Sequence, residues 1–130
     1  MTIRSERVAV TTAGADAAAV GAANTTRPIC GRILKVRLDY HASAPNTTDV
    51  VITEYDVTTS WETIHTETDS TTDVTRYPRR PVEDASETTV TYDGTNEIYE
   101  PFVVDGYVRV AVAGSNALTN CVVVTIFYES

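Results

Sequence analysis

Apolar and polar residues alternate at every second position in several segments of the chain, and this period is typical of strands with one buried face. The clearest examples are residues 33–40 and 107–113. In the first segment one side carries Leu34, Val36, Leu38 and Tyr40, and the other carries Lys35, Arg37 and Asp39. In the second, Val108, Val110 and Val112 share one side. We expect further strands at residues 7–11, 50–55 and 62–67.

The last apolar segment, residues 121–128, differs from the others because both of its faces are largely apolar. One face carries Val122, Val124, Ile126 and Tyr128, and the opposite face carries Cys121, Val123 and Phe127. Such a strand is either central in a two-layer sandwich or covered on one face by another subunit. The residues alone leave both interpretations open.

Turn signals divide the remaining segments. Asp93-Gly94 and Asp105-Gly106 each lie between apolar runs, which is the strongest short hairpin signal. They predict a three-stranded meander over residues 88–113. The alanine-rich residues 13–23 could form a short helix, but Gly14 and Gly21 favour an edge strand or an ordered loop.

Together these patterns predict about eight short strands and an all-β, two-sheet antiparallel β-sandwich with a jelly-roll-like arrangement. A chain of 130 residues suits one domain. We therefore expect a single domain over residues 1–130, with residues 1–28 as a candidate N-terminal arm. Residues 68–86 are expected to be irregular, because Pro78 and Pro81 resist both helices and central strands.

The net charge of the chain limits the classes of partner that it is expected to bind. The formal net charge is −8 and the pI is about 4.6, so most of the surface repels nucleic acid and no nucleic-acid partner is expected. No apolar run is long enough for a transmembrane helix, and the N-terminus lacks the apolar core of a signal peptide. We therefore expect synthesis in the cytoplasm and no membrane partner.

Candidate chemistry is sparse in the sequence. His41 and His65 are too few for the usual zinc sites, and no Gly-x-Ser-x-Gly motif is present. Acidic residues 67–73 lack the spacing of a calcium-binding loop. Cys30 and Cys121 are too few for a disulfide scaffold, and we expect free, half-buried thiols. The chain is thus expected not to be an enzyme and to have no metal site and no cofactor.

Two groups of residues suggest recognition instead. Arg76, Arg79 and Arg80 flank Tyr77 and Pro78, and arginine beside an aromatic residue is enriched at interface hot spots. The same arginines could equally offset acidic residues of their own molecule. The second group is Trp61 and the seven tyrosines, which are more often core and sheet-pairing residues than a platform for sugars.

Four segments in order along the chain resemble a known family. They are residues 31–40 (Gly-Arg-Ile-Leu-Lys-Val-Arg-Leu-Asp-Tyr), 62–64 (Glu-Thr-Ile), 77–84 (Tyr-Pro-Arg-Arg-Pro-Val-Glu-Asp) and 101–110 (Pro-Phe-Val-Val-Asp-Gly-Tyr-Val-Arg-Val). This combination resembles small capsid decoration, or cement, proteins of tailed bacteriophages. The resemblance implies a β-sandwich or jelly-roll protein that binds the major capsid protein as a homotrimer on the outer surface of the virion. The alanine-rich residues 13–23 depart from it.

We accordingly expect a virion structural protein that stabilises a capsid through protein contacts. The residues expected to contact the capsid or other subunits are Arg76, Tyr77, Arg79, Arg80, Val123 and Phe127; residues 2–7 are an alternative contact with the shell. The rival hypothesis is a carbohydrate- or receptor-binding β-sandwich module of a phage tail or fibre that uses Trp61 and exposed tyrosines.

Overall fold

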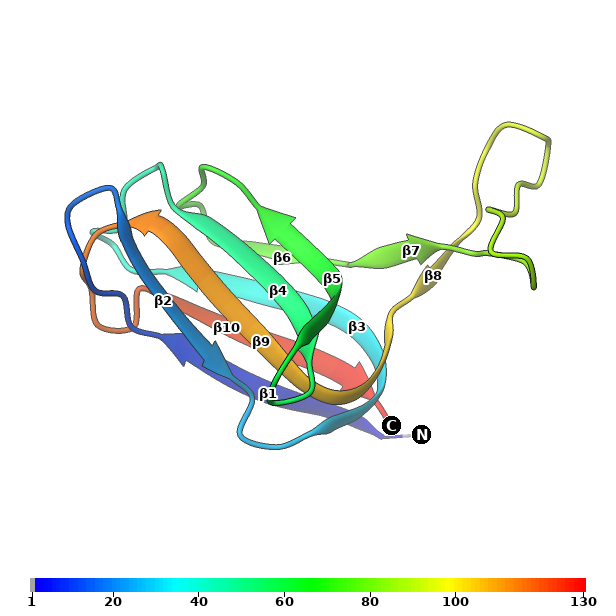
Figure 1. The fold of residues 1–130 in the computed structure, drawn as a ribbon, viewed down its shortest axis with the longest axis horizontal. Coiled ribbons are helices and arrows are strands. Elements are labelled where there is room, and N and C mark those ends of the chain that lie inside the picture. The colour runs from blue at the N-terminus through cyan, green and yellow to red at the C-terminus, as the bar shows by residue number, and fades with distance from the viewer. Residues whose placement is uncertain (1) are drawn as a thin grey trace.

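The computed structural model describes residues 2–130, and Figure 1 shows two layers of antiparallel strands with a thin arm leading away from them. The strands are β1 (Ile3–Val10), β2 (Ala19–Asn24), β3 (Ile29–Tyr40), β4 (Asp49–Tyr55), β5 (Ser60–Glu67), β6 (Val74–Arg76), β7 (Arg79–Pro81), β8 (Tyr99–Pro101), β9 (Val103–Ser115) and β10 (Val122–Glu129). The described residues contain no helix. The expected all-β sandwich is confirmed.

Strand β9 joins the two layers. One layer has the order β1-β10-β3-β6, and the other has the order β2-β9-β4-β5. The first residues of β9 pair with β3, from Val103 opposite Arg32 to Gly106 opposite Ile29, whereas the rest of β9 pairs with β4 and β2. The predicted turn at Asp105-Gly106 is therefore wrong. Gly106 has a φ of 156°, a backbone angle that residues with a Cβ rarely adopt, and it lies where β9 changes partners.

The core lies between the layers and is built from the alternating positions of the long strands. Strand β10 lies between β1 and β3, which makes it central in its layer, as one of the two interpretations held. Its inward side chains, Val122, Val124, Ile126 and Tyr128, are buried. They meet Val108, Val110 and Val112 of β9 in one apolar cluster, and burial of such side chains is the main stabilising term.

Strand β3 departs from simple alternation at one residue. Phe127 pairs with Lys35 and Tyr128 pairs with Ile33, so Leu34 has no partner and forms a β-bulge. The bulge turns Ile33 into the core and leaves Leu34 only half-buried. The expectation that Leu34 shares the face of Val36 and Leu38 is therefore corrected.

The N-terminal residues belong to the sandwich. Of the candidate arm over residues 1–28, residues 3–10 form β1 beside β10, and residues 19–24 form β2 beside β9. Pairing in the two layers satisfies their backbone groups, so they do not extend away from the body. The expectation of an edge strand or ordered loop at residues 13–23 is confirmed, because a turn leads into β2 at the edge of its layer.

The projecting element comes from a later part of the chain. Strands β7 and β8 pair with each other as a separate two-stranded sheet, and the chain between them continues away from the sandwich (Figure 1). We call residues 79–101 the arm. The turn at Asp93-Gly94 lies in its outer part, where the isolated bridge between Thr91 and Glu97 flanks it in place of strands. Residues 68–86 are less irregular than expected, since β6 and β7 lie within them.

Candidate functional site

Each of the three clustered arginines has a partner in its own molecule. Arg76 Nε donates to Glu67 Oε1 at 2.5 Å. Arg80 lies 3.5 to 3.8 Å from the carboxylates of Glu62, Glu83 and Glu100. Arg79 donates to the carbonyl oxygens of Pro78 at 2.7 Å and Leu34 at 3.2 Å. The second interpretation of this cluster, that it offsets acidic residues nearby, thus accounts for Arg76 and Arg80.

The arginines hold the base of the arm against the sandwich. Arg79 reaches the backbone of β3, and the amide of Ile33 donates to the carbonyl oxygen of Phe102 at 2.9 Å. Pro78 and Phe102, which precede and follow the arm, are both buried. Tyr77 is 62% exposed beside this base. Of the residues predicted from this segment, Tyr77 is therefore the one with a large apolar surface open to solvent.

A buried carboxylate links the edges of the two layers. Glu67 of β5 is 8% exposed and accepts hydrogen bonds from Arg76 of β6 and from His65 Nε2 at 2.8 Å. Burial raises the pKa of Glu67, but the hydrogen bonds from Arg76 and His65 outweigh it and hold the pKa below its usual value. These contacts join the edge strands β5 and β6, so we assign the cluster a structural role.

Tyr40 lies next to this carboxylate. Burial raises the pKa of Tyr40 to about 12, and the negative charge of Glu67 adds to the shift. Among the described residues, its hydroxyl has no hydrogen-bond partner. The phenol is therefore neutral over the physiological pH range.

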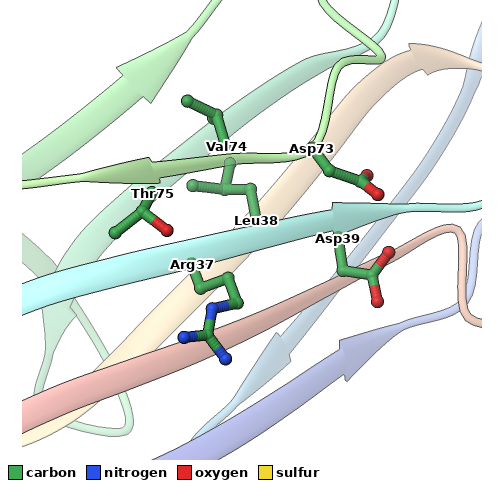
Figure 2. A pocket seen from close by; sticks show the side chains of 6 residues that line it. All are labelled: Arg37, Leu38, Asp39, Asp73, Val74 and Thr75. Atoms are coloured by element: carbon green, nitrogen blue, oxygen red, sulfur yellow. The ribbon is translucent and has the colours of Figure 1, made fainter.

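A shallow open hollow of about 300 Å³ lies between β6 and β3. Its lining consists of Arg37, Leu38, Asp39, Asp73, Val74 and Thr75 (Figure 2). Asp73 has a structural role, because its carboxylate accepts a hydrogen bond from the backbone amide of Tyr40 at 2.8 Å. Figure 2 shows Arg37 and Asp39 on the side of β3 that faces away from Leu38. The hollow is thus continuous with the outer surface of this layer.

The outer surface of the β1-β10-β3 layer carries basic side chains around the ring of Phe127. The register places Arg7, Thr125 and Arg37 side by side across β1, β10 and β3, and places Phe127 beside Lys35. Lys35 Nζ lies 4.8 Å and Arg37 Cζ lies 5.2 Å from the centroid of the Phe127 ring, a cation–π geometry. We call Arg7, Lys35, Arg37, Val123, Thr125 and Phe127 the basic face. It contains both contact residues that were predicted from the C-terminal strand, Val123 and Phe127.

The arm has the opposite charge. Beyond Arg80 it carries six of the chain's 18 acidic residues and none of its ten basic residues: Glu83, Asp84, Glu87, Asp93, Glu97 and Glu100. None of residues 79–101 is buried. Tyr92, Ile98 and Tyr99 are among the large exposed apolar side chains of the molecule. This run of acidic residues is visible in the sequence, but its significance depends on its projection from the body.

Trp61 does not contribute to the core. It is 69% exposed on β5, and its indole Nε1 donates to Asp56 Oδ2 at 2.9 Å, which fixes the orientation of the ring. The hydrogen bonds from Thr59, Trp61 and Thr58 lower the pKa of Asp56. Among the tyrosines, Tyr40 and Tyr128 are buried while Tyr77, Tyr92 and Tyr99 are exposed. Of the aromatic residues expected in the core or in sheet pairing, Tyr40 and Tyr128 therefore lie in the core, whereas Trp61 lies on a strand but outside the core.

The two cysteines are both free but differ in their surroundings. Cys30 is exposed on β3, and Cys121 is completely buried just before β10, 3.1 Å from the hydroxyl of Ser115. The expectation that both thiols are free is confirmed, and the expectation that they are half-buried is wrong. Within residues 2–130 no three side chains of the metal-binding types come together. The described chain has no helix with the length and apolar character of a membrane span.

The comparisons with known proteins add no relative: the chain matches no family model, no curated protein and no solved structure.

Proposed function

We propose that this chain is a structural protein of a tailed-bacteriophage virion, which decorates the outer surface of the capsid by binding the major capsid protein and copies of itself. The observation that carries the proposal is the arm, a projecting element of residues 79–101 without a buried side chain. A two-stranded ribbon of this kind gains little stability from its own packing. An element that contributes so little to folding is suited to contact with another protein.

The rest of the molecule fits a binding role of this kind. The sandwich supplies a rigid body, and the arginines at the base hold the arm in a defined place. The resemblance of residues 31–40, 62–64, 77–84 and 101–110 to decoration proteins supplies the capsid as the partner. We assign the capsid contact to Tyr77 and the neighbouring Arg76, Arg79 and Arg80. No chemical step is required, since the function is the contact itself.

Mass spectrometry of purified virions tests the proposal directly, because a decoration protein is present in many copies per particle. Purified protein is then added to particles that lack it, and its occupancy is measured for wild type and for Tyr77→Ala. We expect Tyr77→Ala to lower the occupancy, since it removes an exposed aromatic side chain from the proposed contact. Absence of the chain from virions, or an unchanged occupancy of Tyr77→Ala together with Arg79→Gln, would contradict the assignment.

A second function is favoured by one observation, the exposed and orientated indole of Trp61. Sugars stack on aromatic faces of this kind, so the chain could serve as a carbohydrate- or receptor-binding module of a tail or fibre. Trp61→Ala is the matched variant to Tyr77→Ala. Glycan-array binding that disappears in Trp61→Ala, with capsid occupancy absent, would favour this function over decoration.

A further inference from the structure

The chain carries two surfaces of opposite charge that do not meet within one molecule. The arm beyond Arg80 has six acidic residues and no basic one. The basic face has Arg7, Lys35 and Arg37, and none of these three has a carboxylate within ion-pair distance among residues 2–130. In Figure 1 the arm leads away from the sandwich. Its acidic tip therefore lies away from the basic face of its own chain.

We propose that the arm of one copy of this chain lies across the basic face of a second copy. Both complementary surfaces are present on every copy, so each molecule can donate its arm to one neighbour and receive the arm of another. Such head-to-tail contacts close into a ring or continue as a filament. The inference specifies the surfaces through which copies of the chain would bind one another in the proposed function, and it does not rest on the contact with the capsid.

The apolar residues of the two surfaces complement each other as well. The arm exposes Tyr92, Ile98 and Tyr99, while the basic face offers the half-buried side chains of Val123 and Phe127. An interface with an apolar centre and a charged rim is the usual composition of a specific protein contact. The cations around Phe127 would then pair with the carboxylates of the arm, and the aromatic side chains would pack between them.

The charges of the molecule favour a second copy of the chain over nucleic acid as the partner of the basic face. Three acidic residues lie close to the basic face: Asp39, Asp73 and Glu129. Asp73 lines the same hollow as Arg37 and accepts a hydrogen bond from the amide of Tyr40, and the carboxylate of Glu129 is 2.6 Å from Arg32. Nucleic acid would also be attracted by this face, but the acidic arms and the net charge of −8 oppose its approach. Long-range attraction between the arm and the basic face increases the rate of encounter between copies and sets their orientation.

The dimensions of the arm are sufficient. Extended chain rises by roughly 3.3 Å per residue, and neighbouring strands lie about 4.8 Å apart. Beyond Val82 and Ile98 the arm forms two short turns, which are closed by isolated bridges from Glu83 to Thr89 and from Thr91 to Glu97. Each side of these turns extends for roughly 10 Å. The distance across three neighbouring strands, β1, β10 and β3, is also about 10 Å.

Charge reversal tests the contact in the purified protein. The face variant carries Lys35→Glu with Arg37→Glu. The arm variant carries Glu83→Lys, Glu87→Lys, Glu97→Lys and Glu100→Lys, so that four lysines face the two remaining acidic residues beyond Arg80. The oligomeric state is measured by sedimentation and native mass spectrometry over a range of protein and salt concentrations. We expect the wild type to associate at low salt and to dissociate as salt rises, since exposed charges are screened beyond about 8 Å at physiological ionic strength. Each variant alone should be monomeric.

The decisive sample combines all six substitutions in one chain. Its arm is basic and its face is acidic, so we expect association to return. The control is Arg4→Glu with Arg27→Glu, which makes the same change of net charge as the face variant, at exposed residues outside the basic face, and should associate as the wild type does. Thermal unfolding of each variant verifies the fold, and Lys35→Gln with Arg37→Gln replaces the face variant if charge reversal disturbs it.

Three results would overturn the proposal. They are a wild-type chain that is monomeric at every concentration, a face variant that associates as tightly as wild type, and a combined variant that stays monomeric. Loss of capsid binding in the face variant with self-association intact would also overturn it, because the capsid would then be the occupant of the basic face. Self-association that persists in a chain absent from virions would contradict only the proposed capsid function.

Discussion

At the scale of single residues, Glu67 illustrates how a charge is kept inside the edge of the sandwich. The carboxylate is 8% exposed and accepts hydrogen bonds from Arg76 and His65. A buried carboxylate is costly unless it is paired and hydrogen-bonded. The partners come from β5 and β6, the edge strands of the two layers. A contact that satisfies one side chain therefore also fastens the layers to each other.

The lowered pKa of Glu67 predicts a pH dependence of stability. Because the folded-state pKa lies below the usual 4.5, Glu67 contributes stability that is fully present above about pH 4.5 and is lost as the pH falls through the folded-state pKa. We expect Glu67→Gln to lower the free energy of unfolding by about 1–2 kcal/mol at pH 7. The difference from wild type should shrink at low pH, as measured by urea denaturation at several pH values.

Glu62→Gln is the matched control for this experiment, because Glu62 lies on the same strand with 42% of its side chain exposed and is 3.6 Å from Arg80. Surface ion pairs contribute little, so its unfolding free energy should remain within about 0.5 kcal/mol of wild type. Equal losses in the two variants, or a loss in Glu67→Gln that does not depend on pH, would contradict the assigned role.

Gly31 is a second residue whose identity the structure requires. A Cβ at this position would lie 2.0 Å from the carbonyl oxygen of Glu129, and its φ is 153°. We expect Gly31→Ala to destabilise the protein by about 2–3 kcal/mol, because backbone must shift to admit the methyl group. Gly94→Ala is the control: its φ is 82° with nothing within 4 Å, so only about 1 kcal/mol should be lost. Similar thermal shifts for both variants would be evidence against the close approach at Gly31.

At the scale of elements, the arm and the long strands differ in how they are stabilised. Strands β3, β9 and β10 bury alternate side chains in the core, whereas residues 79–101 contain no buried side chain. The outer part of the arm is maintained by backbone hydrogen bonds, including that from Val82 to Ile98 at 2.8 Å, and by exposed hydrogen bonds from backbone amides to the carboxylates of Asp84 and Asp93. Such bonds exchange readily with water and add little net stability. The arm should therefore be separable from the folding of the body.

Replacement of residues 83–97 by Asn-Gly tests this separation, because Val82 and Ile98 are paired and an Asn-Gly turn closes a two-residue hairpin. We expect the free energy of unfolding to change by less than about 0.5 kcal/mol, since no core contact is removed. Guanidinium denaturation gives the value. A loss of 2 kcal/mol or more would mean that the arm contributes to the folded body after all.

At the scale of the whole molecule, charge is distributed unevenly. The acidic residues of the arm lie beyond the end of the sandwich, and the unpaired cations of the basic face lie on the outside of the β1-β10-β3 layer. In a molecule with this arrangement, the acidic arm of one copy is attracted to the basic face of another. The proposed self-association and the proposed capsid contact use different surfaces, the basic face and the base of the arm, so both can operate in one assembly.

Amide hydrogen exchange measures this difference across the molecule. We expect the central strands β3, β9 and β10 to exchange most slowly, because their amides are paired on both sides and covered by the core. Amides of residues 83–97 should exchange rapidly in dilute protein and become protected as the protein concentration rises. An arm that exchanges as slowly as β10 in the monomer would show that it is packed on its own body.

Prediction from the sequence succeeded where burial follows local periodicity. The alternation in residues 33–40 and 107–113 indicated a sandwich, because side-chain direction repeats every two residues along any strand. The two apolar faces of residues 121–128 left a central strand as one of two interpretations. The run of acidic residues from Glu83 to Glu100 is likewise a property of the sequence.

Pairing partners were decided only by the tertiary structure. Asp105-Gly106 has the composition of a hairpin turn, yet long-range pairing with β3 and β4 extends β9 through it. The clustered arginines look like a free basic patch until β5 and the arm bring Glu67, Glu62 and Glu100 beside them. Local periodicity determines which way a side chain points, whereas hydrogen bonds and ion pairs between distant segments determine what it meets.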